Sequence, residues 1–317
     1  MKKLVSLMLA VMLVFALAGC SGNAGNEEAT DATGAVNEFT VGICQLMEHE
    51  SLDKATEGFI AALTKKAEEA GVTVKFDTQV AGDANLCSTV VNTFTAKKVD
   101  LIMANATPAL LAAATATKNI PVLGTSVTDY ADTFKGNIPS NVAGTSDAVP
   151  FDEQAKMMID TLKLTEGDVV GVLYCTNESN SLIQYEAVKA LFEEAGIVVN
   201  AYTFSETTEL QALVTKAAGE VKALYVPSDN TVAQNDAIVG SICTGKNVPV
   251  FTSYGGQVCY ASLAIDYYEL GEVTGEMAAE ILFEGKAAEE MGVKTLVPTV
   301  VFNNELCDTL GIEVPEN

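Results

Sequence analysis

The stretch Lys97–Pro108, KKVDLIMANATP, decides the fold, and a second stretch, Glu220–Thr231, EVKALYVPSDNT, repeats its pattern. Each holds an unbroken apolar run between charged residues on one side and polar turn formers on the other. Such a run is typical of a parallel strand that helices cover on both faces. Thr107 places a helix-capping residue directly before Pro108, at the first helical position. Both stretches therefore predict a buried strand followed by a loop and a helix.

Two more pairs of segments match in the same order along the chain. KKAEEAGVTVKF at 65–76 resembles LFEEAGIVVNAY at 191–202, and NIPVLGTSVT at 119–128 resembles NVPVFTSYGG at 247–256. The copies lie roughly 125 residues apart. Three matches in one order make chance similarity a poor explanation, so the chain is predicted to contain the same α/β unit twice. The break between the copies falls near 145–150.

Short apolar runs alternate with amphipathic segments throughout this part of the chain. We predict strands at Phe39–Leu46, Thr73–Gln79, Leu101–Ala104, Val122–Thr125, Val169–Tyr174, Val198–Phe204, Ala223–Val226, Val250–Ser253 and Ala261–Ile265. We predict helices at Ser51–Ala70, Asp83–Lys97, Pro108–Thr117, Phe151–Leu162, Ser181–Ala195, Glu209–Ala217, Val232–Thr244 and Tyr268–Phe283. This alternation indicates βαβ units and an α/β fold of two doubly wound parallel-sheet lobes.

The first residues predict export and a membrane anchor. A basic start, Met1-Lys2-Lys3, precedes an apolar run that ends Leu17-Ala18-Gly19-Cys20. We interpret 1–19 as a secretory signal peptide, because the run is shorter than the roughly 20 residues of a membrane span. Cys20 after Leu-Ala-Gly resembles the bacterial lipobox, which implies a lipid on that cysteine; the alternative is an ordinary signal with an incidental cysteine. Residues 20–37 are polar and aperiodic, which predicts a flexible tether.

Composition excludes several classes of function. The formal charge is −24 at pH 7, and loss of the two signal lysines makes the mature chain more acidic still, which argues against binding nucleic acid or anionic lipid surfaces. Six cysteines follow Cys20 without a C-x-x-C pair or a Cys/His cluster, so we expect no metal site and no cofactor. Export permits disulfides, but most of these cysteines lie in apolar stretches, which favours reduced, buried thiols.

The predicted binding site follows from the predicted sheets. Ligands of open parallel sheets bind beyond the carboxyl ends of the strands, so two such lobes form a cleft lined by strand-end loops. Helix N-termini near 108, 181 and 231 suit a carboxylate and acidic side chains suit an ammonium group, which together indicate an amino acid. The alternative for each residue is a cap or turn role, and His49, the only histidine, is either a ligand contact or a loop residue bonded to a backbone carbonyl. The candidate ligand-binding residues are Glu48, His49, Asn105, Thr107, Ser126, Asn180, Ser181, Asp229, Asn230, Tyr254 and Asp266.

From about Val41 to Ile312 the chain resembles the substrate-binding lipoproteins of ABC importers, in particular the group associated with tryptophan and phenylalanine uptake. The segments that carry the resemblance are GICQLMEHESLD, KKVDLIMANATPALLAAATATKNIPVL, ALYVPSDNTV and AIDYYELGEVTGEMAAEILFEGK. That family commonly has a proline after the first-strand histidine, where this chain has Glu50. The resemblance implies a periplasmic-binding-protein fold of class I with three crossings, near Ser146, Gly255 and Gly292. Lobe 1 would hold 38–146 and 256–291, and lobe 2 would hold 147–255 and 292–317.

The resemblance also implies a function. The protein would be a monomeric, lipid-anchored receptor on the outer face of the membrane of a Gram-positive-type cell, where it captures tryptophan or phenylalanine and delivers it to an ABC permease with its ATPase. We expect an aromatic ligand to lie among Met47, Tyr130, Tyr254 and Tyr267. The alternatives are the same fold with a branched-chain amino acid, a nucleoside or a sugar, or a sensor that reports ligand to a receptor. Catalysis is not expected, because the chain has no Gly-x-Ser-x-Gly elbow and no Walker loop.

Overall fold

The computed structural model describes residues 38–315, which contain two six-stranded sheets. The strands of the first sheet are β1 (Glu38–Gln45), β2 (Thr73–Val80), β3 (Leu101–Asn105), β4 (Val122–Val127), β5 (Val142–Ser146) and β11 (Val293–Thr295). They are ordered β2-β1-β3-β4-β5-β11. All neighbours pair in parallel. This is the 2-1-3-4-5 order of doubly wound sheets with one short strand added at the edge.

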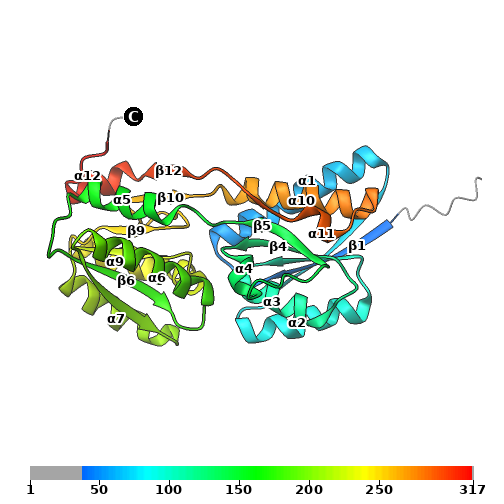
Figure 1. Ribbon diagram of the computed structural model, residues 1–317, viewed down its shortest axis with the longest axis horizontal. Coiled ribbons are helices and arrows are strands. Elements are labelled where there is room, and N and C mark those ends of the chain that lie inside the picture. The colour runs from blue at the N-terminus through cyan, green and yellow to red at the C-terminus, as the bar shows by residue number, and fades with distance from the viewer. Residues whose placement is uncertain (1–37, 316–317) are drawn as a thin grey trace, which may run out of the picture. The chain divides into compact units, whose positions relative to one another are not determined.

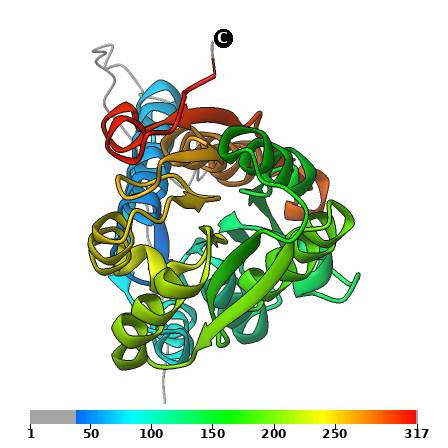
Figure 2. The same ribbon diagram turned by 90° about the vertical axis from the view of Figure 1, so that its left-hand side faces the viewer.

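The second sheet repeats the first. Its strands are β6 (Val169–Cys175), β7 (Val198–Phe204), β8 (Ala223–Val226), β9 (Val250–Thr252), β10 (Ala261–Ala264) and β12 (Thr299–Phe302). They are ordered β7-β6-β8-β9-β10-β12, and only the β10–β12 pair is antiparallel. Figure 2 shows the red C-terminal segment that carries β12 running beside the segment of β10. The equivalent order of the two sheets confirms the predicted duplication and the two-lobed α/β fold.

Helices connect the strands in both lobes. In the first lobe they are α1 (Glu50–Ala70), α2 (Ala84–Lys97), α3 (Thr107–Ala116), α4 (Tyr130–Thr133), α10 (Tyr267–Glu284) and α11 (Ala288–Met291). In the second lobe they are α5 (Phe151–Leu162), α6 (Ser179–Glu194), α7 (Thr207–Glu220), α8 (Asn230–Gln234), α9 (Asp236–Gly245) and α12 (Asn304–Leu310). The helix predicted at Val232–Thr244 is divided at Asn235 into α8 and α9.

The apolar run of β3 is buried on both faces, as its sequence predicts. Leu101 and Met103 pack into a core with α1 and α10, whereas Ile102 and Ala104 face the opposite core with α2 and α3. Figure 1 shows α1, α10 and α11 on one side of the first sheet and α2 and α3 on the other. The matching strand β8 divides its residues between two cores in the same way. Both strand-end loops are therefore held by rigid, two-sided layers.

The chain passes between the two sheets three times. The first crossing follows β5, which ends at Ser146. The second crossing was predicted near Gly255, but β10 pairs with β9 in the second sheet, so the chain crosses after Ala264. The third crossing was predicted near Gly292, but β11 pairs with β5 in the first sheet, so the chain crosses after Thr295. Both corrections have one cause: the sequence did not reveal which sheet accepts a strand of three or four residues.

Helices α1 and α10 approach each other closely and need glycines to do so. A Cβ atom on Gly271 would lie 2.1 Å from the carbonyl oxygen of Ala55, and one on Gly58 would lie 2.1 Å from the carbonyl oxygen of Tyr268. Any side chain at these positions would force the helices apart. The contact matters for function, because α1 begins directly after His49 and α10 begins directly after Asp266.

Candidate functional site

Strand-end residues of the two lobes meet in direct hydrogen bonds. His49 Nε2 lies 3.1 Å from Asn230 Oδ1, which joins the start of α1 to the start of α8. Gln184 Nε2 of α6 lies 3.3 Å from Thr128 Oγ1, which follows β4. Because these contacts join the carboxyl ends of both sheets, they enclose the region in which doubly wound folds bind ligands.

A small inner cavity of about 10 Å³ lies between these contacts. Four of its side-chain polar atoms are buried and have no hydrogen-bond partner among the described residues: His49 Nδ1, Ser126 Oγ, Asp147 Oδ1 and Asn180 Oδ1. Buried polar groups are almost always paired in folded proteins, so four unpaired atoms on one cavity are unusual. They indicate a place built to receive a polar ligand. The cavity is lined by His49, Ser51, Leu52, Ser126, Thr128, Asp147, Asn180, Ser228, Asp229, Asn230, Ala233, Tyr254 and Tyr267.

The backbone presents Ser126 to this cavity in a strained conformation. Its φ angle is 55°, in the left-handed region, and the pairing of β4 with β5 is irregular between Gly124 and Val127. Such backbone costs on the order of 1–3 kcal/mol outside glycine and is concentrated at functional sites. The strain turns the end of β4 inward, where Ser126 is buried with its hydroxyl group unpaired.

The N-terminus of α1 opens onto the same cavity. The helix has 21 residues, and its N-cap, His49, makes no side-chain hydrogen bond to the first turn. Ser51 and Leu52 of that turn line the inner cavity. An uncapped first turn offers backbone N–H groups and the positive end of the helix dipole, which together favour an anionic group such as a carboxylate.

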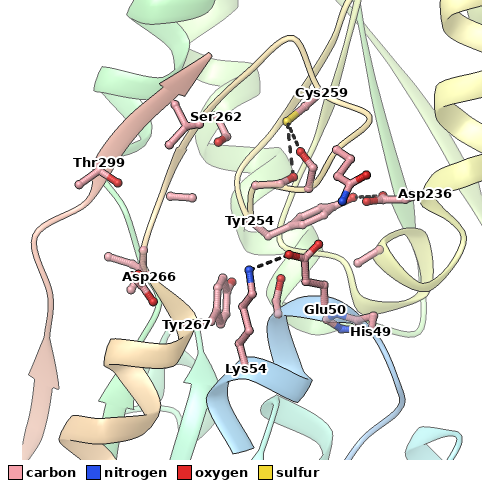
Figure 3. A pocket seen from close by; sticks show the side chains of 18 of the residues that line it. His49, Glu50, Lys54, Asp236, Tyr254, Cys259, Ser262, Asp266, Tyr267 and Thr299 are labelled. Atoms are coloured by element: carbon pink, nitrogen blue, oxygen red, sulfur yellow. Dashed lines mark hydrogen bonds and ion pairs between the residues drawn. The ribbon is translucent and has the colours of Figure 1, made fainter. Parts of the chain in front are cut away.

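An outer cavity of about 440 Å³ adjoins the inner one and shares His49, Ser51, Ala233, Tyr254 and Tyr267 with it. Figure 3 shows Tyr254 and Tyr267 beside Glu50 and Lys54 of α1, which form an ion pair of 2.6 Å. The volume lies within the range of ordinary small-molecule sites. The other lining residues are Asp236, Gly255, Gly256, Gln257, Cys259, Ser262, Ala264, Ile265, Asp266, Thr299, Val301 and Asn303.

Among the carboxylates that line the outer cavity, Asp236 has a raised pKa. Burial raises its pKa to about 6, while the hydroxyl of Tyr254, which donates to Oδ1 at 2.5 Å, acts in the opposite direction. In the inner cavity, burial raises the pKa of Asp147, and a hydrogen bond from Tyr267 opposes that shift. A buried carboxylate of this kind is stabilised as an anion when a cation binds beside it.

A family model for ABC transporter substrate binding proteins matches residues 40–317. The chain is an ABC transporter substrate-binding protein. It is 36% identical to a protein of Clostridioides difficile strain R20291 named Tyrosine-binding protein, over 98% of this chain and 91% of the relative. The family acts outside the cytoplasm, which agrees with the resemblance found in the sequence.

Two solved structures are informative. The substrate-binding protein is similar to a domain from Streptococcus pneumonia in complex with L-Trp, with 29% identity, a TM-score of 0.80 and coverage of 88% of this chain and 96% of that chain. It is also similar to the ligand-free, open structure of a substrate binding protein with adhesive properties from Clostridium difficile, with 33% identity, a TM-score of 0.66 and coverage of 88% and 97%. The chain is therefore structurally more similar to the L-Trp complex than to the ligand-free, open structure, although its sequence identity to the L-Trp complex is lower.

The structure brings six of the predicted residues of the substrate-binding protein to the inner cavity. They are His49, Ser126, Asn180, Asp229, Asn230 and Tyr254. Asp266 lines the outer cavity, where it is exposed and caps α10 by accepting from the N–H groups of Tyr268 and Glu269. Asp229 is also a cap, because its carboxylate accepts from the N–H groups of Cys175, at 2.7 Å, and Val232, at 2.9 Å. The ligand contacts of all these residues stay predictions.

Four predicted residues line neither cavity. Glu48 is exposed. Asn105 is buried, and its amide group donates to Leu52 O and Thr56 Oγ1. Thr107 lines a separate groove beside α3. Ser181 is buried with its hydroxyl unpaired. Parallel strands end at one edge of a sheet, but their side chains alternate in direction, so not every strand-end residue reaches the cleft.

The sequence prediction missed Asp147. This residue follows β5, a strand that was not predicted because VAGTS contains glycine and small polar residues. The internal repeat could have revealed it, since β10 occupies in the second sheet the place of β5 in the first and is followed by Asp266. Glu50, which replaces the proline common in the family, is the first residue of α1, a position that proline also tolerates.

Of the residues proposed for an aromatic slot, Tyr254 and Tyr267 line the outer cavity. Tyr130 instead packs in the first-lobe core and donates to Thr145 O at 3.1 Å. The six cysteines within 38–315 are buried and form no disulfide in that part of the chain. No helix within 38–315 is long and apolar enough to cross a membrane. The predicted signal peptide, the predicted tether and Cys20 lie outside the described residues.

Proposed function

We propose that this substrate-binding protein captures an aromatic amino acid, as a zwitterion, in the two adjoining cavities between its lobes. The observation that carries the proposal is the group of four unpaired polar atoms on the inner cavity. The ligand's charged head group would pair with them, and its side chain would occupy the outer cavity. The names of the relatives, a tyrosine-binding protein and an L-Trp complex, support this ligand class.

Opposite charges of the ligand have separate partners in the inner cavity. We place the ammonium group beside Asp147 Oδ1, because a charged donor makes the stronger hydrogen bond to a buried carboxylate oxygen that lacks a partner. The carboxylate is placed at the first turn of α1, where Ser51 and Leu52 offer backbone N–H groups, with the hydroxyl of Ser126 as a further donor. This division discriminates amino acids from sugars and nucleosides, which lack the paired charges.

The outer cavity suits a flat, partly polar side chain. Tyr254 and Tyr267 supply aromatic surface, and Ile265 and Ala264 supply aliphatic surface. Asp236 lies on the same wall and can accept a hydrogen bond from a phenol or indole donor. A ligand that carries such a donor, tyrosine or tryptophan, is therefore favoured over phenylalanine.

Ligand entry requires the lobes to separate. An inner cavity of about 10 Å³ has room for about one water molecule, far less than an amino acid head group needs, so the lobes must lie farther apart around a bound ligand than they do in this structure. The greater similarity to the L-Trp complex than to the open, ligand-free relative supports the assignment of this arrangement to the closed form. Opening at the three crossings would admit the ligand, and contacts to both lobes would then stabilise closure.

The protein acts as a monomeric receptor without catalytic activity, held outside the cell membrane by a lipid on Cys20, and delivers its ligand to a permease with an ATPase. The family assignment supports delivery to a transporter. Replacement of Cys20 by alanine tests the anchor: the variant protein should be recovered in the culture medium or the periplasm, and retention of Cys20→Ala in the membrane fraction would disprove lipid anchoring at this residue.

A thermal-shift screen tests the ligand class. A protein of residues 36–317, whose described part 38–315 lies within one compact unit, is mixed with each amino acid, with nucleosides and with sugars. A ligand at 100 times its dissociation constant adds about 2.7 kcal/mol to the free energy of unfolding. We expect shifts with tyrosine and tryptophan. A shift with a sugar or nucleoside and none with any aromatic amino acid would refute the proposal.

A further inference from the structure

The side chain of Glu178 holds Asn230 in one orientation. Glu178 is buried, with 4% of its surface exposed. Its Oε2 accepts from the backbone N–H of Asn230, at 2.9 Å, and from the Nδ2 amide group of Asn230, at 2.6 Å. Its Oε1 accepts from the N–H and the hydroxyl of Thr231, both at 2.8 Å. A flipped Asn230 amide would place its oxygen against the carboxylate, so Asn230 Oδ1 is held away from Glu178 and toward His49.

The orientation of Asn230 sets the tautomer of His49. Asn230 Oδ1 is a carbonyl-type oxygen and can only accept, so His49 Nε2, 3.1 Å away, must carry the proton and donate. In a neutral imidazole the other nitrogen, Nδ1, then bears a lone pair. Burial, the largest influence, lowers the pKa of His49, which favours the neutral ring, while Asn230, Glu178 and Asp53 act in the opposite direction.

The lone pair of His49 Nδ1 lies on the inner cavity and has no partner among the described residues. Two other unpaired acceptors line the same cavity. One is Asp147 Oδ1, and the other is Asn180 Oδ1, whose identity as the oxygen follows from donation by Asn180 Nδ2 to Ser228 O at 2.7 Å. The cavity therefore presents three acceptors, the number that a primary ammonium group can satisfy with its three N–H bonds.

We propose that Glu178 acts through Asn230 as a positioning residue that keeps His49 in the Nε2–H tautomer, so that Nδ1 accepts a hydrogen bond from the ammonium group of the ligand. This inference rests on the proposed function and deepens it, because it explains how the site selects a primary amine. Glu178 lies outside the wall of the inner cavity, and its effect on the ligand passes through two hydrogen bonds.

His49 is the only histidine of the chain, so nitrogen-15 NMR of histidine-labelled protein reports on this ring alone. At pH 7 and without ligand, the two-bond proton–nitrogen correlations should show the neutral Nε2–H form. Addition of L-tyrosine or L-tryptophan should shift the Nδ1 resonance more than the Nε2 resonance. An Nδ1–H tautomer in the wild-type protein, or an Nδ1 resonance that does not respond to a ligand that binds, would overturn the inference.

Asn230→Leu removes the acceptor and keeps the approximate volume. We expect mixed tautomers in this variant and a loss of about tenfold in affinity for L-tyrosine. Affinity for 3-(4-hydroxyphenyl)propanoate, which lacks the ammonium group, should change less than about twofold, since no donor meets Nδ1. Glu178→Gln should likewise give mixed tautomers of His49 and a lower affinity for L-tyrosine. Asn235→Ala, in the same segment but outside both cavities, is the matched control and should keep the wild-type tautomer and affinity.

The outcomes separate the two proposals. If no aromatic amino acid binds the wild-type protein, the proposed function fails. The tautomer of His49 in the ligand-free protein still decides whether Glu178 and Asn230 determine the protonation of its ring. If L-tyrosine binds but Asn230→Leu, shown to be folded by circular dichroism, weakens both ligands equally, the role of His49 in ammonium recognition is refuted while the proposed function stands. If Asn230→Leu does not fold, the wild-type tautomer and its response to ligand remain decisive.

Discussion

The hydroxyl group of Tyr267 donates a hydrogen bond of 2.9 Å to Asp147 Oδ2 and thereby joins the first and second crossings between the lobes. Both residues line the inner cavity, and both are buried. The bond leaves the other carboxylate oxygen, Oδ1, unpaired and oriented by a rigid partner. Under the proposed function, Asp147 both contacts the other crossing through Tyr267 and faces the ammonium group of the ligand, which would couple ligand binding to the position of the crossings.

Replacement of Asp147 by asparagine should abolish high-affinity binding and leave the fold intact. The change keeps the shape of the side chain but removes the charge that faces the ammonium group, so we expect a loss on the order of 100-fold in affinity for aromatic amino acids. Isothermal titration calorimetry measures it. Glu48→Gln, an exposed position outside both cavities, serves as the control. Unchanged affinity in Asp147→Asn would remove this residue from the binding site.

Replacement of Asp229 by alanine should reduce stability. Its carboxylate is buried and accepts from the N–H groups of Cys175 and Val232, so truncation leaves two buried donors unpaired and costs about 2–4 kcal/mol in the free energy of unfolding. Urea denaturation without ligand provides the measurement. A variant as stable as the wild-type protein, yet unable to bind ligand, would show instead that Asp229 contacts the ligand directly.

Replacement of Gly271 by alanine should destabilise the first lobe, because the new Cβ atom would lie 2.1 Å from Ala55 O. Overpacking of this kind costs about 1–3 kcal/mol or more. Gly219→Ala is the matched control, since Gly219 also lies in a helix, α7, and a Cβ atom there meets only Lys246 Nζ, at 3.8 Å. That control should gain up to about 1 kcal/mol. Equal effects of the two substitutions would contradict the close contact of α1 and α10.

Asp236 should make stability depend on pH. Its pKa is raised from 3.8 to about 6 in the folded protein, chiefly by burial and also by the charge of Glu50. The folded state therefore binds this proton more tightly than the unfolded chain. The resulting contribution of Asp236 to the free energy of unfolding is fully present below pH 3.8 and is lost as the pH rises through about 6. Between these two pH values the free energy of unfolding of the wild-type protein should fall by at most about 3 kcal/mol more than that of Asp236→Asn. Parallel pH profiles of the two proteins would argue against a raised pKa.

Much of the fold could be predicted because its signal is local. The apolar runs of β3 and β8 determine strands buried on both faces, and their repetition indicates two equivalent lobes. The short strands could not be assigned, since a run of three or four residues such as β11 carries no periodicity that says which sheet accepts it. For that reason the second and third crossings were placed too early.

The location of the candidate site could be predicted from the sequence, but the roles of its individual residues could not. Strand-end loops drew attention to His49, Ser126 and Asn230, which the structure brings to the inner cavity, while their ligand contacts stay predictions. Asp229 shows why: a carboxylate after a strand is equally typical of a ligand contact and of a cap, and its role as a cap appears only in its hydrogen bonds to Cys175 and Val232. Which polar atoms lack partners depends on side-chain direction, which composition and spacing do not encode.

The most direct test of the central claim is calorimetric titration of the protein with L-tyrosine and two analogues, tyramine, which lacks the carboxylate, and 3-(4-hydroxyphenyl)propanoate, which lacks the ammonium group. Recognition of a zwitterion by Asp147 and by the N-terminus of α1 predicts that L-tyrosine binds at least about 100-fold more tightly than either analogue. Equal affinity for all three compounds, or no binding of L-tyrosine, L-tryptophan and L-phenylalanine, would contradict it.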